Sequence, residues 1–250
     1  MKDKLKTGFT LVELIIAVAV GMIIMTAIYA MINLGQGSTG GISRRVLTQQ
    51  DSRAVLDLMA MEVGMASFNP TSDNAIWGKT PLQSDGTACV DADVPSPFLQ
   101  VRRGIQTAGP NSILVSMNLN ADTQIGGNVT NSENEYIRYS FDANTGTIKR
   151  AVSCGGDQPI IGGANSSTMI RNNVAGVPLF QYFNTAGTDI SANVSATPNA
   201  PPGNGGISDI RRIRINIIAD VENDDKRSTF KTSRRTYSTD VLVRNHALSQ

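Results

Sequence analysis

Apolar residues run almost without interruption through the N-terminal part of this 250-residue chain, from Phe9 to Leu34. The uncharged stretch within this run, Leu14 to Leu34, holds 21 residues. As an α-helix it would span about 31 Å, close to the roughly 30 Å hydrocarbon core of a bilayer. The pattern therefore predicts a transmembrane helix over residues 9–34. The polar positions within it are Thr10, Glu13, Thr26 and Asn33.

A helical pattern resumes after this run and extends to Asn69. Ser43 is suited to capping the restart, and Pro70 disfavours helical backbone at the residue before it. Residues 35–69 are therefore predicted to form an amphipathic second half of the helix, with an apolar stripe that lies along a sheet. The stripe comprises Ile42, Val46, Val55, Leu56, Met59 and Val63.

Glycines interrupt the helical pattern at the junction of the two halves. Gly21 lies inside the apolar run, and four more glycines cluster from Gly35 to Gly41. Each interior glycine costs a helix about 1 kcal/mol relative to alanine. We therefore expect a bend or a frayed turn near Gly35–Gly41, where the helix leaves the bilayer.

From Pro70 onward the pattern changes to strands and loops. In Arg212–Ala219, isoleucines at every second position alternate with polar residues. Such alternation fits an antiparallel sheet with one covered and one solvated face. The other predicted strands are Ser112–Asn118, Glu135–Phe141, Thr147–Val152, Leu179–Phe183 and Tyr237–Val243.

Together these elements predict an α+β fold, in which the long N-terminal helix packs on an antiparallel β-sheet formed by a β-rich globular domain over residues 70–250. Loops rich in Gly, Asn, Ser and Pro separate the strands, and loops this long are usually functional or mobile. They are Thr71–Pro97, Gly155–Gly176 and Asn184–Gly206.

Charge is balanced over the whole chain but not over its first residues. The chain has 22 basic and 21 acidic residues, and 19 and 20 of these lie beyond Met1–Gly8, which carries three lysines against one aspartate. By the positive-inside rule this basic leader places the N-terminus in the cytoplasm, so the region from Arg44 onward should be exported. A nearly neutral chain has no net field to attract nucleic acid.

Composition also weighs against catalysis. The one histidine, His246, lies close to the C-terminus, and the chain has two cysteines. A His/Cys metal site or a histidine-based triad therefore has almost nothing from which to be built. We expect a protein that is not an enzyme and that holds no cofactor or metal ion.

Glu13 distinguishes three interpretations of the apolar run. A secretory signal peptide has a shorter apolar core of about 7–15 residues, and a plain membrane anchor leaves the carboxylate unexplained. An acidic side chain in a membrane segment costs a few kcal/mol, so a partner or a function is the default expectation. The third interpretation, a processed assembly helix, accounts for both the length of the run and the glutamate.

The segment Lys6-Thr7-Gly8-Phe9-Thr10-Leu11-Val12-Glu13 resembles the class III signal of type IV prepilins and type II secretion pseudopilins. In that family a short basic leader ends in Gly, the next residue is usually Phe or Met, and a Glu stands five residues after the cut. Gly8, Phe9 and Glu13 match these elements. The family's helix-kinking proline is missing, since no proline occurs between Phe9 and Phe68.

The resemblance implies a pilin-like fold and a leader peptide, residues 1–8, that prepilin peptidase removes by cutting between Gly8 and Phe9. The new Phe9 amine is then methylated, and the helix stays with the mature protein. A carboxylate in an apolar setting needs a compensating cation, and the Phe9 amine of the same or a neighbouring subunit would supply it to Glu13. The implied partners are other pilin subunits, the peptidase and the inner membrane.

The order of elements is similar to that of PilW-type minor pilins and, more loosely, of J-type minor pseudopilins. That resemblance implies a minor subunit that helps to prime a type IV pilus, held in the inner membrane before assembly. Two alternatives remain open: a minor pseudopilin of a type II secretion or competence system, and a membrane-anchored adhesive or binding protein.

Cys89 and Cys154 both fall in the predicted exported region, where disulfides form and persist. Pairing them would close a loop of about 65 residues, worth roughly 4 kcal/mol in the chain-entropy model. We therefore predict a disulfide between them.

Two clusters of charge have a functional and a simpler interpretation. The acidic turn at 222–225 has oxygen ligands suited to Ca²⁺ but lacks the spacing of an EF-hand loop, so a solvated turn is expected. The basic stripe invites comparison with phosphate-binding surfaces, but it lacks the interleaved aromatic residues of single-strand binders. Nucleic acid is therefore not an expected partner. The stripe comprises Arg211, Arg212, Arg214, Arg234 and Arg235.

Overall fold

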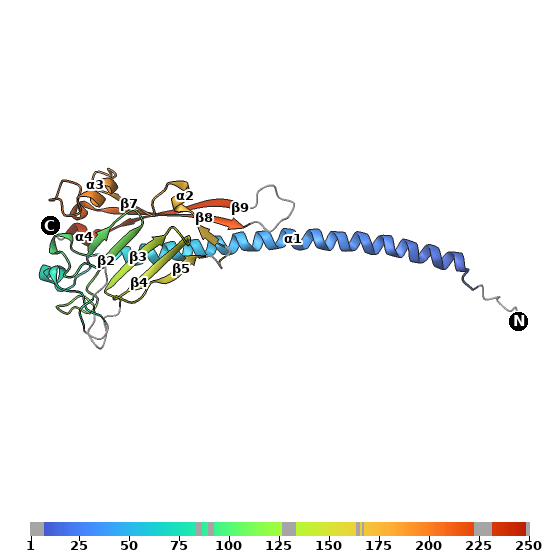
Figure 1. Cartoon of the computed structure of the whole chain (residues 1–250), viewed down its shortest axis with the longest axis horizontal. Coiled ribbons are helices and arrows are strands. Elements are labelled where there is room, and N and C mark those ends of the chain that lie inside the picture. Colours follow the sequence, from blue (N-terminus) through green and yellow to red (C-terminus); the bar gives the residue numbers. More distant parts are fainter. Residues whose placement is uncertain are drawn as a thin grey trace.

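A single helix, α1, dominates the computed structural model and runs from Leu11 to Gly64. With 54 residues it is about 81 Å long, and Figure 1 shows it as a gently curved rod that extends beyond a β-rich domain. The structure describes residues 8–83, 87–89, 93–126, 134–163, 166, 168–222 and 232–248.

The expected bend near Gly35–Gly41 is wrong, because α1 is continuous through the glycine cluster. The predicted cap at Ser43 is wrong for the same reason. Glycine weakens a helix by propensity alone. A break would expose unpaired carbonyl and amide groups on both sides and would require a second, costly nucleation. Helical turns on both sides of the cluster therefore carry the chain through it.

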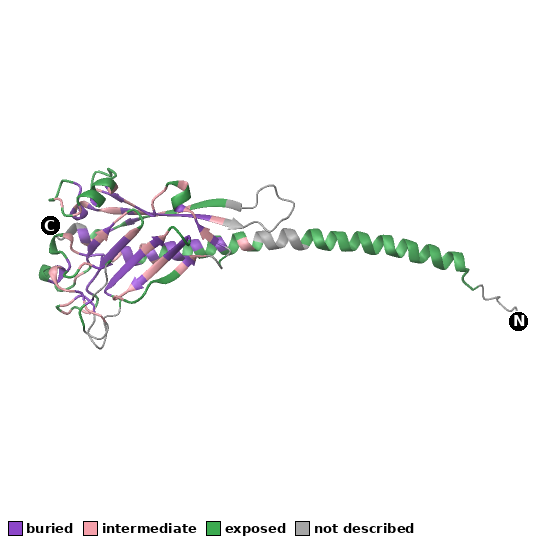
Figure 2. Cartoon of the chain, viewed as in Figure 1, coloured by how far each residue is buried: buried purple, intermediate pink, exposed green. Residues whose placement is uncertain are grey.

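The amphipathic half of α1 enters the globular domain later than the stripe predicted. Val46 is 47% exposed, whereas Val55, Leu56, Met59 and Val63 are buried. The buried face begins at Thr48, whose hydroxyl lies 2.8 Å from that of Thr168. From there α1 contacts strands of two sheets, and Figure 2 shows buried residues interspersed with exposed ones, as expected of a helix with one covered face.

Helix α1 ends at Gly64, five residues before the predicted stop at Asn69. Ser67 adopts a left-handed backbone conformation, with φ of 64°, and its N–H donates to the Ser116 carbonyl at 3.0 Å. Gly104 permits this close approach, because a Cβ there would lie 2.0 Å from the Ser67 nitrogen. Pairing with the sheet, rather than Pro70, therefore terminates the helix.

The α+β prediction is confirmed, but the strands form two antiparallel sheets instead of one. The first has the order β1-β2-β3-β4-β5; in the second, β6 and β7 pair with one edge of β8, and β9 pairs with the other. The strands of the first sheet are β1 (Ile105–Ala108), β2 (Ser112–Ser116), β3 (Tyr136–Asp142), β4 (Thr147–Val152) and β5 (Gln158–Gly162). Those of the second are β6 (Thr168–Ile170), β7 (Phe180–Phe183), β8 (Arg212–Glu222) and β9 (Thr232–Leu242).

All six predicted strands are present, but β9 begins five residues earlier and β8 ends three residues later than predicted, and three strands were missed. These are β1, β5 and β6, which have three to five residues each. Two of them lie inside a segment that we expected to be loop, 155–176, because so short a run has no clear periodicity. Short helices were missed as well: α2 (Asn172–Ala175), α3 (Ser191–Ala196) and α4 (Arg244–Leu248).

Both sheets and α1 share one apolar core. Ile213, Ile215 and Ile217 of β8 are fully buried in it, and Val63 of α1 joins them. Val241 of β9 approaches α1 so closely that a Cβ on Gly64 would lie 3.6 Å from its side chain. The strand predicted over residues 212–219 is confirmed, but buried and solvated positions alternate only as far as Ile215, because Asn216 and Ile218 are buried too.

A buried polar network also joins α1 to the first sheet. The Glu62 carboxylate accepts hydrogen bonds from Arg150 Nη2 on β4 at 2.6 Å and from Arg150 Nε at 3.0 Å. The Tyr139 hydroxyl of β3 donates to the same carboxylate. Burial and the hydrogen bond to Glu62 raise the pKa of Tyr139 well above its usual value. Without these hydrogen bonds, burying the Glu62 carboxylate would cost several kcal/mol of stability.

His246 on α4 is fully buried and fixes the C-terminus to the domain. Its Nε2 lies 2.9 Å from the Ile207 carbonyl, which can only accept, so Nε2 carries the proton. Its Nδ1 then accepts from the Ser67 hydroxyl at 2.9 Å, and the Ser67 oxygen accepts from the Gly104 N–H. Desolvation by burial lowers the pKa of His246 to about 4.

Acid should therefore destabilise the domain through His246. In the unfolded chain the imidazole has a pKa near 6.5. Between about pH 6.5 and pH 4 the unfolded state therefore binds a proton that the folded state does not, and stability falls as the pH falls. We expect about 2–3 kcal/mol of stability to be lost between pH 7 and pH 4 through this group. Urea unfolding of the full chain in detergent, compared with His246→Gln, measures it. An equal pH dependence in both proteins would contradict this assignment.

Candidate processing and assembly site

Gly8 and Phe9 lie outside regular secondary structure, Thr10 has extended backbone, and the chain becomes helical at Leu11. Gly8 is exposed and has open space where a Cβ would be, and the Phe9 side chain is 90% exposed. A peptide bond flanked by an unhindered glycine and lying outside regular structure is accessible to a peptidase. Of the predicted leader, residues 1–8, the first seven with their three lysines lie outside the described residues.

Thr10 and Glu13 form a reciprocal cap at the start of α1. The Glu13 N–H donates to the Thr10 hydroxyl at 3.3 Å. In return, Glu13 Oε2 accepts from the Thr10 N–H at 3.1 Å and from its hydroxyl at 3.2 Å. This capping box satisfies amide groups that the first turn of a helix leaves unpaired.

The cap places the Glu13 carboxylate beside the backbone of Thr10, the residue that follows Phe9. If the chain is cut after Gly8, the new ammonium group is on Phe9, one residue from that backbone amide. Sequence reasoning identified Gly8, Phe9 and Glu13 but missed Thr10. The spacing Thr-x-x-Glu before an apolar run is a signature of a capping box and could have revealed it.

Among the residues that the structure describes, none covers the apolar part of α1. Leu11–Gly35 is long and apolar enough to cross a membrane, with 25 residues and a mean hydropathy of 2.6. No residue in its most apolar stretch is buried. Figure 2 shows this part of the helix as exposed along its whole length. So large an apolar surface requires a membrane or another protein to cover it.

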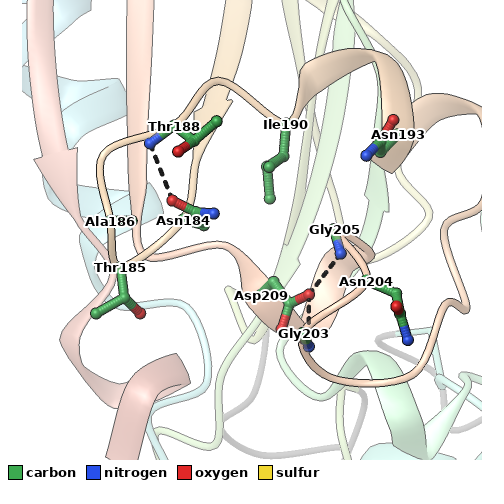
Figure 3. Close-up of a pocket in the computed structure, with 10 residues that line it drawn as sticks. All are labelled: Asn184, Thr185, Ala186, Thr188, Ile190, Asn193, Gly203, Asn204, Gly205 and Asp209. Carbon is green, nitrogen blue, oxygen red and sulfur yellow. Dashed lines mark hydrogen bonds between the residues drawn. The ribbon is translucent and has the colours of Figure 1, made fainter.

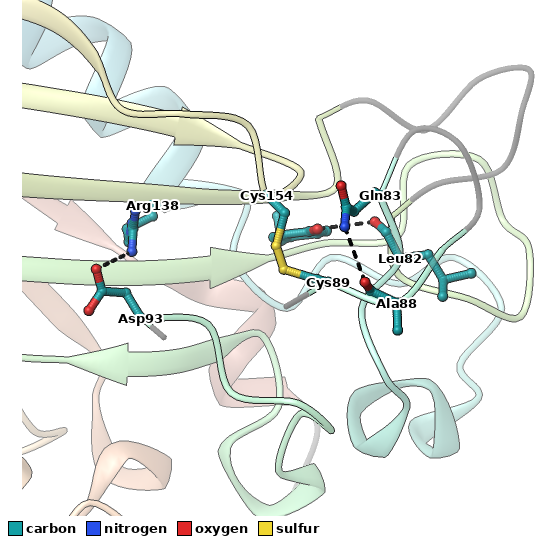
Figure 4. The surroundings of a disulfide bond; sticks show 8 residues. Leu82, Gln83, Ala88, Cys89, Asp93, Arg138 and Cys154 are labelled. Atoms are coloured by element: carbon teal, nitrogen blue, oxygen red, sulfur yellow. Dashed lines mark hydrogen bonds and ion pairs between the residues drawn. A yellow bond between two sulfur atoms is a disulfide. The ribbon is translucent and has the colours of Figure 1, made fainter. Parts of the chain in front are cut away.

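Cys89 and Cys154 form a disulfide with their Cα atoms 5.8 Å apart, as the sequence predicted. Cys154 follows β4, and Cys89 belongs to a second apolar cluster that includes Trp77 and Tyr136. Figure 4 shows the bond beside the carbonyls of Leu82 and Ala88, and the Leu82 carbonyl accepts from the Tyr136 hydroxyl at 3.0 Å. The disulfide therefore fastens the long segment after α1 to the first sheet.

Two carboxylates pair with three of the five arginines of the predicted basic stripe. Asp240 pairs with both Arg212 and Arg214, at 2.7 and 2.8 Å, and the hydrogen bond from Arg214 is the main cause of its lowered pKa. Asp220 pairs with Arg234 at 2.9 Å. Paired arginines on a solvated sheet face are a poor phosphate-binding surface.

The acidic turn proposed as a calcium site lies mostly outside the described residues. Glu222 is the last residue of β8, and residues 223–225 are not described. Among the residues that the structure does describe, no three His, Cys, Asp or Glu side chains are grouped closely enough to hold a metal ion.

Residues 3–29 match the family model of the prokaryotic N-terminal methylation motif. The chain therefore carries a prepilin-type N-terminus and is similar there to type IV pilin-like proteins, as its sequence predicted. Proteins of that kind are structural subunits rather than enzymes. The matched segment contains Gly8, Phe9, Thr10 and Glu13, together with the first part of α1.

A solved structure with a similar backbone is a type IV-like pilin from Thermus thermophilus. The two sequences are 9% identical, the TM-score is 0.41, and the alignment covers 80% of this chain and 98% of that one. No curated protein matches the sequence.

Proposed function

We propose that this chain is a minor pilin, an assembly subunit of a type IV pilus. Prepilin peptidase removes residues 1–8, the Phe9 amine is methylated, and α1 then holds the subunit first in the inner membrane and later in the filament. Before assembly the N-terminus faces the cytoplasm and the β-rich domain lies outside. The observation that carries the proposal is the methylation motif over residues 3–29, placed directly on a helix whose apolar part is fully exposed.

The geometry at Glu13 supports a role in assembly. Its carboxylate lies at the N-terminal end of α1, where the helix dipole stabilises negative charge. In an apolar filament core or in a bilayer, that stabilisation alone is smaller than the cost of a buried carboxylate. The Phe9 ammonium of the same or of a neighbouring subunit supplies the remaining compensation, and this pairing sets how far one helix slides along the next.

The structure of the domain supports a minor subunit over a bulk one. Two sheets and their long connections occupy residues 66–248, so the exported part is large compared with the helix that would pack in a filament. Helix α1 also contains no proline, whereas the family that it resembles has a helix-kinking proline in many of its bulk subunits. The same features fit a minor pseudopilin of a type II secretion system. Neighbouring genes distinguish the two, because secretin and secretion-ATPase genes would accompany a pseudopilin.

Mass spectrometry of the mature N-terminus tests the proposal. We expect a chain that begins at Phe9 and carries one extra methyl group on its amine when the peptidase is present. A strain without the peptidase serves as the control and should yield the chain that begins at Met1. An intact Met1 in the presence of the peptidase would contradict the proposed processing.

A further inference from the structure

A pocket of about 570 Å³ opens in the segment expected to be a long loop, residues 184–206. Its walls come from the turn after β7, from Asn193 in the first turn of α3, and from residues 203–209 (Figure 3). Figure 1 places α3 at the end of the domain away from the N-terminus of α1. The volume falls within the roughly 300–1,000 Å³ usual for small-molecule sites.

Hydrogen bonds fix the walls of this pocket. The Asp209 carboxylate accepts from the N–H groups of Gly203 at 2.8 Å and Gly205 at 2.7 Å (Figure 3). Both glycines have positive φ, which other residues rarely adopt. On the opposite wall Asn184 Oδ1 accepts from the Thr188 N–H at 2.9 Å. The pocket is therefore formed in advance rather than assembled around a ligand.

Its lining also has hydrogen-bonding capacity that the protein leaves unused. Within the described part of the chain, the amides of Asn193 and Asn204 and the hydroxyls of Thr185 and Thr188 have no protein partner. An amide side chain both donates and accepts, and so does a hydroxyl. Together they can match a ligand whose groups also donate and accept.

The charges of the lining restrict the class of ligand. Among the described residues that line the pocket there is no Lys, Arg or His, so none of them compensates a phosphate or a carboxylate. The one carboxylate, Asp209, is already engaged by backbone amides and has no second acidic group beside it for a divalent cation. Ile190 and Ala186 add a small apolar surface.

We propose that this pocket binds a neutral saccharide. The hydroxyls of a sugar both donate and accept, as the Asn and Thr side chains require, and the C–H groups of its ring suit Ile190. The site does not depend on assembly into a filament, so it can be tested on the single chain.

Saturation-transfer NMR of the full chain in detergent tests the proposal. The probes are glucose, galactose and N-acetylglucosamine, with N-acetylneuraminic acid as a carboxylate-bearing comparison. We expect transfer to at least one neutral sugar and weaker transfer to the acidic one, because Asp209 repels it.

Two substitutions locate the binding site. Asn193→Leu should abolish the transfer, since it removes an amide and fills space beside Gly205, whose hypothetical Cβ would already lie 2.9 Å from Asn193 Nδ2. Asn144→Leu is the matched control, an exposed asparagine in the turn between β3 and β4, and should leave the transfer unchanged.

Three outcomes would overturn the proposal: no transfer to any of the neutral sugars, stronger transfer to the acidic sugar, or transfer that survives Asn193→Leu. Unchanged Trp77 fluorescence and unfolding midpoint in the Asn193 variant would show that any loss of transfer is local.

Discussion

Glu13→Gln should leave the subunit processed and membrane-held but largely absent from filaments. Glutamine can replace glutamate in the capping box, so the hydrogen bonds to Thr10 and the start of α1 should persist. What is lost is the negative charge that we propose to pair with the Phe9 ammonium. Leaving one member of a buried ion pair uncompensated costs about 3–5 kcal/mol, and about 1.4 kcal/mol is tenfold in an equilibrium. We therefore expect the sheared filament fraction to contain at least about tenfold less of the variant.

Immunoblots of sheared filaments and of membranes measure the two populations. Thr10→Ala is the matched control: it weakens the cap, by about 1 kcal/mol, but keeps the charge, and should reduce incorporation much less. If Glu13→Gln assembles as well as the parent chain, the cap explains the glutamate and the ion-pair hypothesis is wrong. If the protein instead acts as a membrane-anchored adhesin that does not assemble, both variants should still bind their surface or ligand.

Glu62→Ala should destabilise the globular domain by roughly 2–4 kcal/mol. The substitution leaves the Arg150 guanidinium and the Tyr139 hydroxyl without the carboxylate that they share. Because the Arg150 side chain keeps 23% of its exposure, solvent recovers part of the loss and the effect stays near the lower end for a buried pair.

Denaturant unfolding of the full chain, followed by the fluorescence of Trp77, measures this loss. Trp77 is the one tryptophan of the chain and is 1% exposed, so its emission reports on the domain rather than on the membrane helix. Asp57→Ala removes an exposed carboxylate from the same helix and should change stability by less than about 0.5 kcal/mol. Equal effects of the two substitutions would show that the Glu62 network contributes no stability of its own.

Local patterns were enough to predict the features that depend on local physics. The apolar run at 9–34 predicted a helix of membrane length, because length and composition alone decide the match to a bilayer, and the structure is helical from Leu11 onward. The alternation along 212–219 likewise predicted β8, since a strand with one buried face must alternate. The segment from Gly8 to Glu13 was also sufficient to suggest a methylation motif, which the family model matches.

Packing decided the features that the sequence pattern left open or predicted wrongly. Helix α1 passes through the glycine cluster because turns on both sides propagate it, and it ends at Gly64 because Ser67 pairs with Ser116 on β2. The short strands β1, β5 and β6 form only because longer neighbours offer them an edge. A run of three to five residues has too few side chains to show a period by itself. The equally short β2 and β7 were predicted because their apolar and aromatic residues are more densely placed.

The polar sites also divide into those that the sequence predicted and those that only the tertiary structure shows. Sequence alone predicted roles for Gly8, Phe9 and Glu13, because these three residues lie within a single short motif, and the family model matches that segment. It could not reveal that Glu62 meets Arg150, 88 positions away, or that Asn184 and Asp209 face one pocket. Contacts between residues distant in the chain depend on how the two sheets fold around α1, and only the tertiary structure shows that arrangement.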